Sequence, residues 1–220
     1  MRTVAILPVK MFSHAKQRLD AGVAPGPRQA LAEAMFADVL VALRRAQRVD
    51  ATLVVSSDLG AQRIAGAHGA IVLEDDADRG HNPAAAKGIQ RALEHGAERA
   101  LLVPGDCPLL DPDELDELLA RPVDLPSALI VPDRHGTGTN ALVLTPPGSL
   151  EPSFGPGSCA RHLANARLAG TAAEVVRVPT LALDVDTPED LDAVADALES
   201  TRGGAARTRG ALSQLLRAGA

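Results

Sequence analysis

The feature that most constrains the fold of this sequence is a regular alternation of short apolar runs with longer segments of helical periodicity. Apolar runs at 3–9, 52–56, 70–73 and 100–103 predict buried strands. Segments at 28–47, 59–67, 83–95 and from Asp111 onward predict the intervening helices. Because parallel strands need long crossovers, which helices usually supply, this order predicts an α/β fold with a mostly parallel sheet and helices on both faces.

The second half of the chain is less regular. It predicts strands at 128–131, 141–144, 174–178 and 181–184, and helices at 158–168 and from Thr187 to about residue 198. A length of 220 residues is typical of one domain. We therefore expect a single domain over residues 1–199. An Arg-, Gly- and Ala-rich tail follows over 200–220, which we expect to be flexible, with a short helix near 212–217.

Charge and composition exclude several classes of partner. The formal net charge is -6, Trp and Tyr are absent, and Phe occurs three times. A chain without a basic face or an aromatic platform is not expected to bind nucleic acid. Apolar runs fall well short of the ~20 residues that span a bilayer, and no signal peptide is visible. With two distant cysteines, Cys107 and Cys159, a cytoplasmic protein without a membrane partner is expected.

The loop after the first predicted strand is basic. Pro8 starts an extended turn, and Lys10, Lys16 and Arg18 follow before any helix. In open α/β sheets, ligands bind at the carboxyl ends of the strands, so these cations are placed to neutralise a polyphosphate. The alternative is a solvated basic surface loop. Neither GxxxxGK[ST] nor GxGxxG is present, which excludes a P-loop and the dinucleotide fingerprint.

The loop after the fourth predicted strand holds one carboxylate in a constrained backbone. Asp106 lies between Pro104 and Pro108 and follows a glycine. A carboxylate fixed at a strand end is a good ligand for a hard cation. The alternative is that Asp106 caps the next helix, but Asp111 already fills that position. We interpret Asp106 as a metal ligand.

A second acidic cluster lies near the end of the predicted domain. Asp184 and Asp186 are two residues apart in a segment expected to be extended, so their side chains point the same way. Together with Asp106 they are predicted to hold Mg²⁺ against the phosphates of a nucleotide, since oxygen ligands suit that ion. The alternative is that Asp186 caps the last helix, alongside Thr187.

Two loops rich in glycine are candidate anion sites. The loop 154–158 enters a predicted helix, where its amides and the Ser158 hydroxyl are placed to bind a small anion. The turn 136–140 adds hydroxyl and amide donors, and Arg161 and His162 are expected to add charge. Either loop is also explained by the need to turn the chain. Two such loops beside an acidic cluster favour a site.

Asn82 precedes Pro83 and the third predicted helix. Its amide offers a donor and an acceptor, which suits contact with a purine edge. Capping of the helix explains the same residue equally well.

Taken together, these segments resemble one known family. The resemblance rests on segments 6–10, 16–19, 104–108, 136–140, 154–158 and 183–188, in this order. They are similar to the 2-phospho-L-lactate and phosphoenolpyruvate guanylyltransferases of coenzyme F-420 biosynthesis, relatives of the molybdopterin nucleotidyltransferases. The resemblance covers about residues 3–199 and implies a Rossmann-like, GT-A-like nucleotidyltransferase fold. One departure is His81, where an apolar residue is expected between Gly80 and Asn82.

The resemblance implies a Mg²⁺-dependent transfer of GMP from GTP to the phosphate of a three-carbon acid, with release of pyrophosphate. The implied nucleotide-binding residues are Pro8, Lys10, Lys16, Arg18, Asn82 and Asp106. Lys10, Lys16 and Asp106 are the implied catalytic residues, and Asp106, Asp184 and Asp186 the metal ligands. Thr139, Gly155 and Ser158 are expected to bind the acceptor. An acceptor phosphate is already anionic, so alignment and charge neutralisation suffice without a general base.

The composition is rich in Ala, Arg and Gly, which is typical of a GC-rich actinobacterial genome. In such bacteria the resemblance implies phosphoenolpyruvate as the acceptor. The alternatives are 2-phospho-L-lactate and 3-phosphoglycerate in the same reaction. We also expect the product to be handed to a downstream F-420 transferase. Two rival functions are a nucleotidyltransferase acting on a pterin or sugar phosphate and a non-catalytic nucleotide-binding protein of the same fold.

Overall fold

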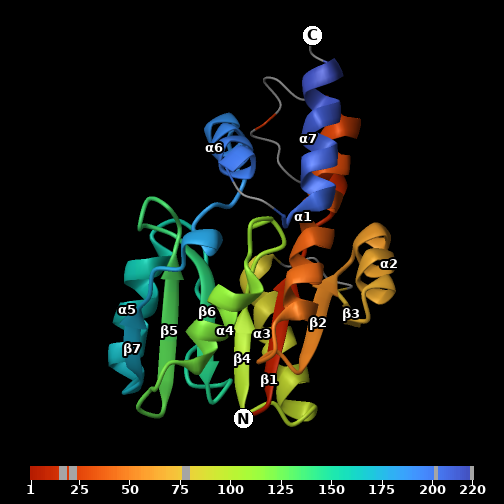
Figure 1. Cartoon of the computed structure of the whole chain (residues 1–220). Coiled ribbons are helices and arrows are strands. Elements are labelled where there is room, and N and C mark those ends of the chain that lie inside the picture. Colours follow the sequence, from red (N-terminus) through yellow and green to blue (C-terminus); the bar gives the residue numbers. More distant parts are fainter. Residues whose placement is uncertain (15–18, 20–23, 76–79, 201–202, 219–220) are drawn as a thin grey trace.

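The computed structural model describes residues 1–14, 19, 24–75, 80–200 and 203–218 (Figure 1). Its strands are β1 (Thr3–Pro8), β2 (Ala51–Ser56), β3 (Ile71–Glu74), β4 (Arg99–Leu102), β5 (Ser127–Pro132), β6 (Thr139–Thr145) and β7 (Ala172–Val175). The α-helices are α1 (Pro25–Arg45), α2 (Leu59–Ala67), α3 (His81–Glu94), α4 (Pro112–Ala120), α5 (Ser158–Ala169), α6 (Pro188–Ser200) and α7 (Ala206–Ala218). Short 3-10 helices lie at Phe12–His14 and Pro179–Leu181.

The strands form one seven-stranded sheet in the order β3-β2-β1-β4-β6-β5-β7. β1 pairs in parallel with β2 and β4, and β2 with β3. β6 is antiparallel to both of its neighbours, whereas β5 and β7 are parallel to each other. Among the described strands β6 alone is therefore reversed, and the prediction of a mixed, mostly parallel sheet is confirmed.

Helices cover both faces of the sheet, as predicted (Figure 1). Side chains alternate between the faces along each strand, because the period of a strand is two. In β1, Ala5 and Leu7 pack with α1, α2 and α4, while Val4 and Ile6 pack with α3 and α5. Both faces are built from aliphatic side chains, in line with the scarcity of aromatic residues.

The predicted strand at 181–184 is wrong. The chain forms β7 earlier than expected, then a 3-10 turn at Pro179–Leu181, and runs on without pairing to the start of α6. Proline fixes φ at a value that suits the first position of a helical turn. The Leu181 carbonyl accepts a hydrogen bond of 2.8 Å from the Asn140 side chain, so a side chain satisfies it in place of a neighbouring strand.

The C-terminal segment is not the flexible tail that the sequence suggested. Over its described residues it contains α7, which packs along α1 (Figure 1). The Asp38 carboxylate of α1 accepts hydrogen bonds from the Arg207 and Thr208 amides and from the Thr208 hydroxyl, at 3.3, 2.8 and 2.8 Å. Thr208 is fully buried, and Leu212, one turn later, belongs to a buried cluster shared with α6. The composition suggested solvation, but residues 208, 212 and 215 share one helical face.

No helix in the described part of the chain is long and apolar enough to cross a membrane.

Candidate active site

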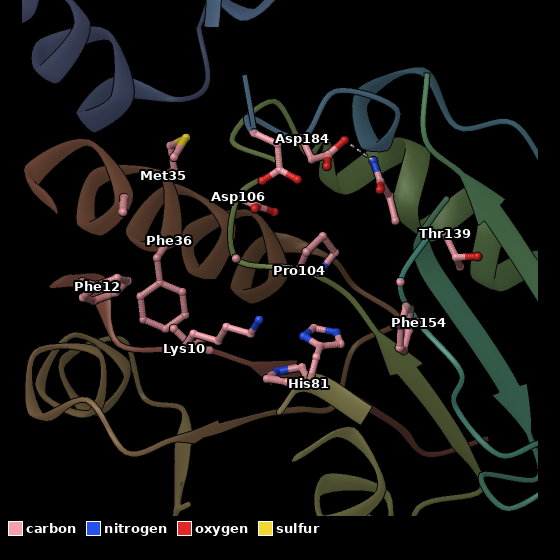
Figure 2. Close-up of a pocket in the computed structure, with 17 residues that line it drawn as sticks. Lys10, Phe12, Met35, Phe36, His81, Pro104, Asp106, Thr139, Phe154 and Asp184 are labelled. Atoms are coloured by element: carbon pink, nitrogen blue, oxygen red, sulfur yellow. Dashed lines mark hydrogen bonds between the residues drawn. The ribbon is translucent and has the colours of Figure 1, made fainter. Parts of the chain in front are cut away.

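A pocket of about 550 Å³ lies at the carboxyl ends of β1 and β4 and beside the first residues of β6. This is the edge of an open α/β sheet at which ligands bind. Figure 2 shows Asp106 and Asp184 on one side, Lys10 and His81 across from them, and Thr139 and Phe154 at one end. The predicted site residues that line the pocket are Pro8, Lys10, Asp106, Thr139, Gly155, Asp184 and Asp186.

The loop that carries Asp106 passes close to α1. A Cβ on Gly105 would lie 3.0 Å from the ring of Phe36, which is buried in α1 and packs against Phe12 with 5.8 Å between ring centroids. Only glycine lets the backbone cross this ring at that distance without displacing it. The packing of α1 therefore fixes the path of the loop and the place of Asp106.

The two acidic segments meet at one wall of the pocket. The Val185 amide donates to the Asp106 carbonyl at 3.3 Å, which brings the segment holding Asp184 and Asp186 against the loop after β4. Asn140, at the start of β6, donates to the Asp184 carboxylate at 3.0 Å (Figure 2). We call Asp106, Asp184 and Asp186 the acidic wall.

The ionised form of the Asp184 carboxylate is disfavoured by its surroundings. Burial raises its pKa to about 6, and the negative charges of Asp106 and Asp186 contribute in the same direction against the hydrogen bond from Asn140. A nearby cation would stabilise the ionised form of Asp184. The acidic wall thus has the charge of a cation site.

The acidic wall is not a preassembled metal centre. No group of three His, Cys, Asp or Glu side chains with ligating geometry occurs in the described residues. Mg²⁺ is usually held by one or two carboxylates plus phosphate oxygens and water, so a bound nucleotide would complete such a site. The carboxylates that line the pocket and the raised pKa of Asp184 fit this kind of site.

The cap at the start of α6 comes from Thr187, which the alternative named alongside Asp186. Thr187 precedes α6, and Asp190 accepts from the Asp186 and Thr187 amides at 3.0 and 2.8 Å, while the Asp190 amide donates to the Thr187 hydroxyl at 3.3 Å. This reciprocal arrangement is a capping box. The Asp186 side chain lines the pocket instead. The predicted cap of α4 by Asp111 is confirmed, with amide contacts at 2.8 and 3.2 Å.

Lys10 of the predicted basic loop lines the pocket. It is exposed, and its amino group points toward His81 (Figure 2). Lys16 and Arg18 lie outside the described residues, so their predicted contacts with a triphosphate stay predictions.

At one end of the pocket, beside the acidic wall, the loop 153–155 and the first residue of β6 form what we call the loop wall (Figure 2). Thr139 and Gly155 line the pocket there. Gly155 has φ +116°, a conformation that glycine adopts without strain. Ser158, predicted to bind the same ligand, is buried in the first turn of α5 and is not part of the pocket lining.

Asn82 holds the loop wall in place. Its amide nitrogen donates to the Phe154 carbonyl at 3.1 Å, and its amide oxygen accepts from the Phe154 amide at 2.7 Å. It does not cap α3, which begins at His81 with Gly80 as its N-cap, so that alternative is wrong. Asn82 is also absent from the pocket lining, and its predicted contact with a purine edge stays a prediction.

Arg161 and His162 do not add free charge to the site, contrary to expectation. The Arg161 guanidinium donates to the carbonyls of Ser153, Phe154 and Pro156, at distances from 2.8 to 3.4 Å. His162 is fully buried, and burial, with a smaller effect of Arg161, lowers its pKa to about 4. Both side chains fix the loop wall from α5.

The sequence reasoning missed three contributions to the site. The sequence indicates Asn140 only as one hydrogen-bond donor of a turn, whereas in the structure its side chain orients the Asp184 carboxylate. Met35 and Phe36 of α1 supply an apolar side of the pocket, visible in the sequence only as a helical face. His81, noted only as a departure from the family pattern, lines the pocket and packs edge-on against Phe154, with 5.0 Å between ring centroids. Burial lowers the His81 pKa, against the effect of Asp106.

The fold is that of the nucleotidyltransferases. Among solved structures, 4-diphosphocytidyl-2C-methyl-D-erythritol synthase superimposes with a TM-score of 0.64, at 16% identity, covering 90% of this chain and 98% of that one. At this identity the likeness shows the fold alone. The family model described as guanylyl transferase CofC like matches residues 3–201, and the chain belongs to that family.

The chain is similar to curated relatives over nearly all of its length. It is 56% identical to the phosphoenolpyruvate guanylyltransferase of Conexibacter woesei, covering 99% of this chain and 98% of the relative. It is 43% identical to the protein of that name from Sphaerobacter thermophilus, with 89% and 93% covered. Two more distant relatives are the 2-phospho-L-lactate guanylyltransferase of Methanothermobacter thermautotrophicus, at 35%, and the 3-phospho-D-glycerate guanylyltransferase of Colwellia psychrerythraea, at 34%.

Proposed function

We propose that this protein transfers the guanylyl group of GTP to the phosphate of phosphoenolpyruvate and releases pyrophosphate. An oxygen of the acceptor phosphate attacks the α-phosphorus of GTP. A new bond forms there as the bond to the bridging oxygen of pyrophosphate breaks. The observation that carries the proposal is the 56% identity, over nearly the whole of both chains, to a phosphoenolpyruvate guanylyltransferase.

The pocket offers separate surfaces to the two substrates. Lys10 lies at the end of β1 and is proposed to neutralise the triphosphate, together with the predicted Lys16 and Arg18. Thr139 and the Gly155 backbone are proposed to bind the carboxylate or phosphate of the acceptor. Two anionic substrates that meet in one pocket repel each other, so their alignment and neutralisation are the work required of the protein.

The acidic wall is proposed to hold Mg²⁺ through Asp106 and Asp184, with Asp186 nearer to solvent. The ion would supply positive charge to the phosphate oxygens as the bond to pyrophosphate breaks. The Val185 amide joins the two carboxylate-bearing segments, and Asn140 orients the Asp184 carboxylate. The acceptor phosphate is already ionised, so no side chain has to remove a proton from it.

The wider biological setting is part of the same proposal. A guanylylated phosphoenolpyruvate is an activated, labile intermediate, which suits transfer to a second enzyme in coenzyme F-420 biosynthesis. The cytoplasmic location and the hand-over of product stay predictions.

Pyrophosphate release tests the proposal directly. Purified protein is incubated with GTP and Mg²⁺ and, in separate reactions, with phosphoenolpyruvate, 2-phospho-L-lactate or 3-phosphoglycerate. A parallel series uses ATP, and a trapping enzyme for the labile product is included. Asp106→Asn is the matched control for contaminating activity. We expect the fastest release with GTP and phosphoenolpyruvate, and background release by the variant.

The other outcomes separate the rival functions. Faster release with a different three-carbon acid keeps the reaction and corrects the acceptor, as the more distant relatives would suggest. Release with none of the three acids contradicts the proposal. In that case, GTP binding by calorimetry without turnover would support a non-catalytic nucleotide-binding protein.

A further inference from the structure

The loop wall contains a buried histidine that touches both of its segments. His162, on α5, is fully buried, and its two ring nitrogens bond to different elements. Nε2 accepts a hydrogen bond of 3.0 Å from the Ser153 amide, and Nδ1 lies 3.0 Å from the Thr139 hydroxyl. The ring also packs edge-on against Phe154, with 5.2 Å between ring centroids. One side chain thus joins the start of β6 to the loop 153–155.

These partners determine which nitrogen of His162 carries the proton. A backbone amide can only donate, so Nε2 must present its lone pair to Ser153. The proton of the neutral ring then sits on Nδ1 and is donated to the Thr139 oxygen. Burial keeps the ring neutral, since its pKa is lowered to about 4.

The tautomer in turn sets the polarity of Thr139. A hydroxyl group has one proton and two lone pairs, and here one lone pair is taken by His162. The proton is therefore free to be donated to another oxygen. With the opposite tautomer, Thr139 would donate to the ring and present only lone pairs, which repel an anion. Thr139 lines the pocket, so this difference decides whether it attracts or repels an anionic ligand.

We infer that His162 is a positioning residue for the phosphorylated acceptor, because it makes the Thr139 hydroxyl an obligate donor and ties it to the loop 153–155. The inference rests on the proposed function for the identity of the acceptor, and on the hydrogen bonds of His162 for the polarity. His162 itself touches no reacting atom. Its effect belongs to acceptor binding and leaves the nucleotide and the acidic wall unchanged.

The two contacts of His162 can be removed separately. In His162→Asn, the amide nitrogen takes roughly the place of Nδ1 and keeps the donor to Thr139, but the contact with Ser153 is lost. In His162→Gln, the amide oxygen takes roughly the place of Nε2 and keeps the acceptor for Ser153, but the donor to Thr139 is lost. Asn165→Ala is a matched control, because Asn165 contacts the Ser153 hydroxyl from the same helix at 3.4 Å.

Steady-state kinetics then distinguish a specific effect on acceptor binding from a general loss of order in the loop wall. We expect His162→Gln to raise the KM for phosphoenolpyruvate about tenfold, which is typical for the loss of one hydrogen bond to a charged group. The KM for GTP should change less than about twofold, and His162→Asn and Asn165→Ala should raise the acceptor KM much less. Thr139→Val should match His162→Gln, and the double variant should show no further rise, since both remove one interaction.

A measurement on the wild-type protein reports the tautomer directly. Proton–nitrogen correlation spectra of the histidine rings report which nitrogen is protonated, and the His162 signals are assigned by their loss in His162→Asn. We expect a neutral ring with the proton on Nδ1 at pH 7.5. A proton on Nε2, or a charged ring, would overturn the inference, as would additive effects of His162→Gln and Thr139→Val.

Failure of the proposed function has a different signature. If the wild-type protein transfers guanylyl groups to no three-carbon acid, the proposed reaction is wrong while the ring spectrum still reports the polarity of Thr139. Calorimetric binding of phosphoenolpyruvate then replaces the KM. Equal affinities of wild type and His162→Gln would reject His162 as a positioning residue.

Discussion

The acidic wall and the loop wall face the same pocket, yet they are built in opposite ways. In the loop wall, Asn82, Arg161 and His162 hold the backbone of residues 153–156 through hydrogen bonds to its carbonyl and amide groups. In the acidic wall, Asp184 is half-buried beside other carboxylates, and its charged form is disfavoured. The loop wall is held by hydrogen bonds among its own groups, whereas the acidic wall carries a carboxylate whose charged form a cation would stabilise.

Burial acts on both walls and moves the two titrations in opposite directions. It raises the pKa of the Asp184 carboxyl to about 6 and lowers the pKa of the His162 imidazole to about 4. In each case the neutral form is favoured. For His162 the neutral ring is the form that makes both hydrogen bonds. For Asp184 the neutral form is the one that binds a metal poorly, so burial there opposes the proposed function until a cation enters.

The largest effect should come from the charge of the acidic wall. Asp106→Asn keeps the size of the side chain and removes its charge, so the proposed Mg²⁺ would be held less tightly and the phosphates would lose its positive charge. We expect turnover to fall about a thousandfold, since metal and charge stabilisation contribute several kcal/mol. Pyrophosphate release at saturating GTP and Mg²⁺ measures it. Thr139→Val, on the loop wall, should lose far less. Comparable losses for the two variants would contradict the contrast between the walls.

Acid should destabilise the loop wall through His162. The pKa is about 4 in the folded protein and 6.5 ordinarily, so between these values the unfolded chain binds the proton more readily. The free energy of unfolding therefore falls as the pH drops through 6.5, by up to about 3 kcal/mol near pH 4. Urea denaturation of wild type and His162→Asn across this range isolates the effect. The variant should lose less stability between pH 7 and 4, and parallel curves would contradict the prediction.

Helix α7 should support the acidic wall more than the loop wall. Val185, between the two acidic residues, is buried in the cluster that joins α1, α6 and α7. Asp38→Ala removes the three hydrogen bonds that fix the start of α7, at a cost of about 2 kcal/mol, at the upper end for a lost helix cap. Urea denaturation measures the loss. The KM for GTP should rise with little change for the acceptor, and equal rises would show that α7 supports both walls.

The main features of the fold could be predicted from the sequence because they depend on local patterns. Apolar runs specified most of the sheet, and Asp111 followed by Pro112 specified the start of α4. The position of Asp106 at a strand end also pointed to the pocket. These predictions need no knowledge of which distant segments come together.

The features that were missed depend on contacts between distant segments. The link from Asn140 to Asp184 and the cap that Asp38 gives α7 join residues far apart in the chain. The 181–184 segment has the composition of a strand, but its partner is a side chain and not a strand. His162 follows the same rule, because its charge state is set by its burial and by the Ser153 amide, neither of which is visible in sequence.

The smallest expected effect is a gain in the free energy of unfolding, whereas the preceding changes lower stability or activity. It compares the two walls directly. Asp184→Asn removes a carboxylate that burial and Asp106 disfavour, and its amide keeps the size of the side chain. The folded pKa, about 6, lies above the ordinary 3.8, so the penalty on folding is fully present above pH 6 and disappears as the pH falls toward 4. Without Mg²⁺ at pH 7.5 we expect the variant to be more stable by about 1–2 kcal/mol, with a loss of activity.

Urea denaturation at pH 7.5 and pH 4.5 tests this prediction, because the gain should shrink at the lower pH. Added Mg²⁺ should stabilise the wild type and not the variant, which separates the ion from general salt effects. A variant less stable than wild type in metal-free buffer would mean that the hydrogen bond from Asn140 outweighs the repulsion. The acidic wall would then be as complete without a ligand as the loop wall, and the contrast between them would fail.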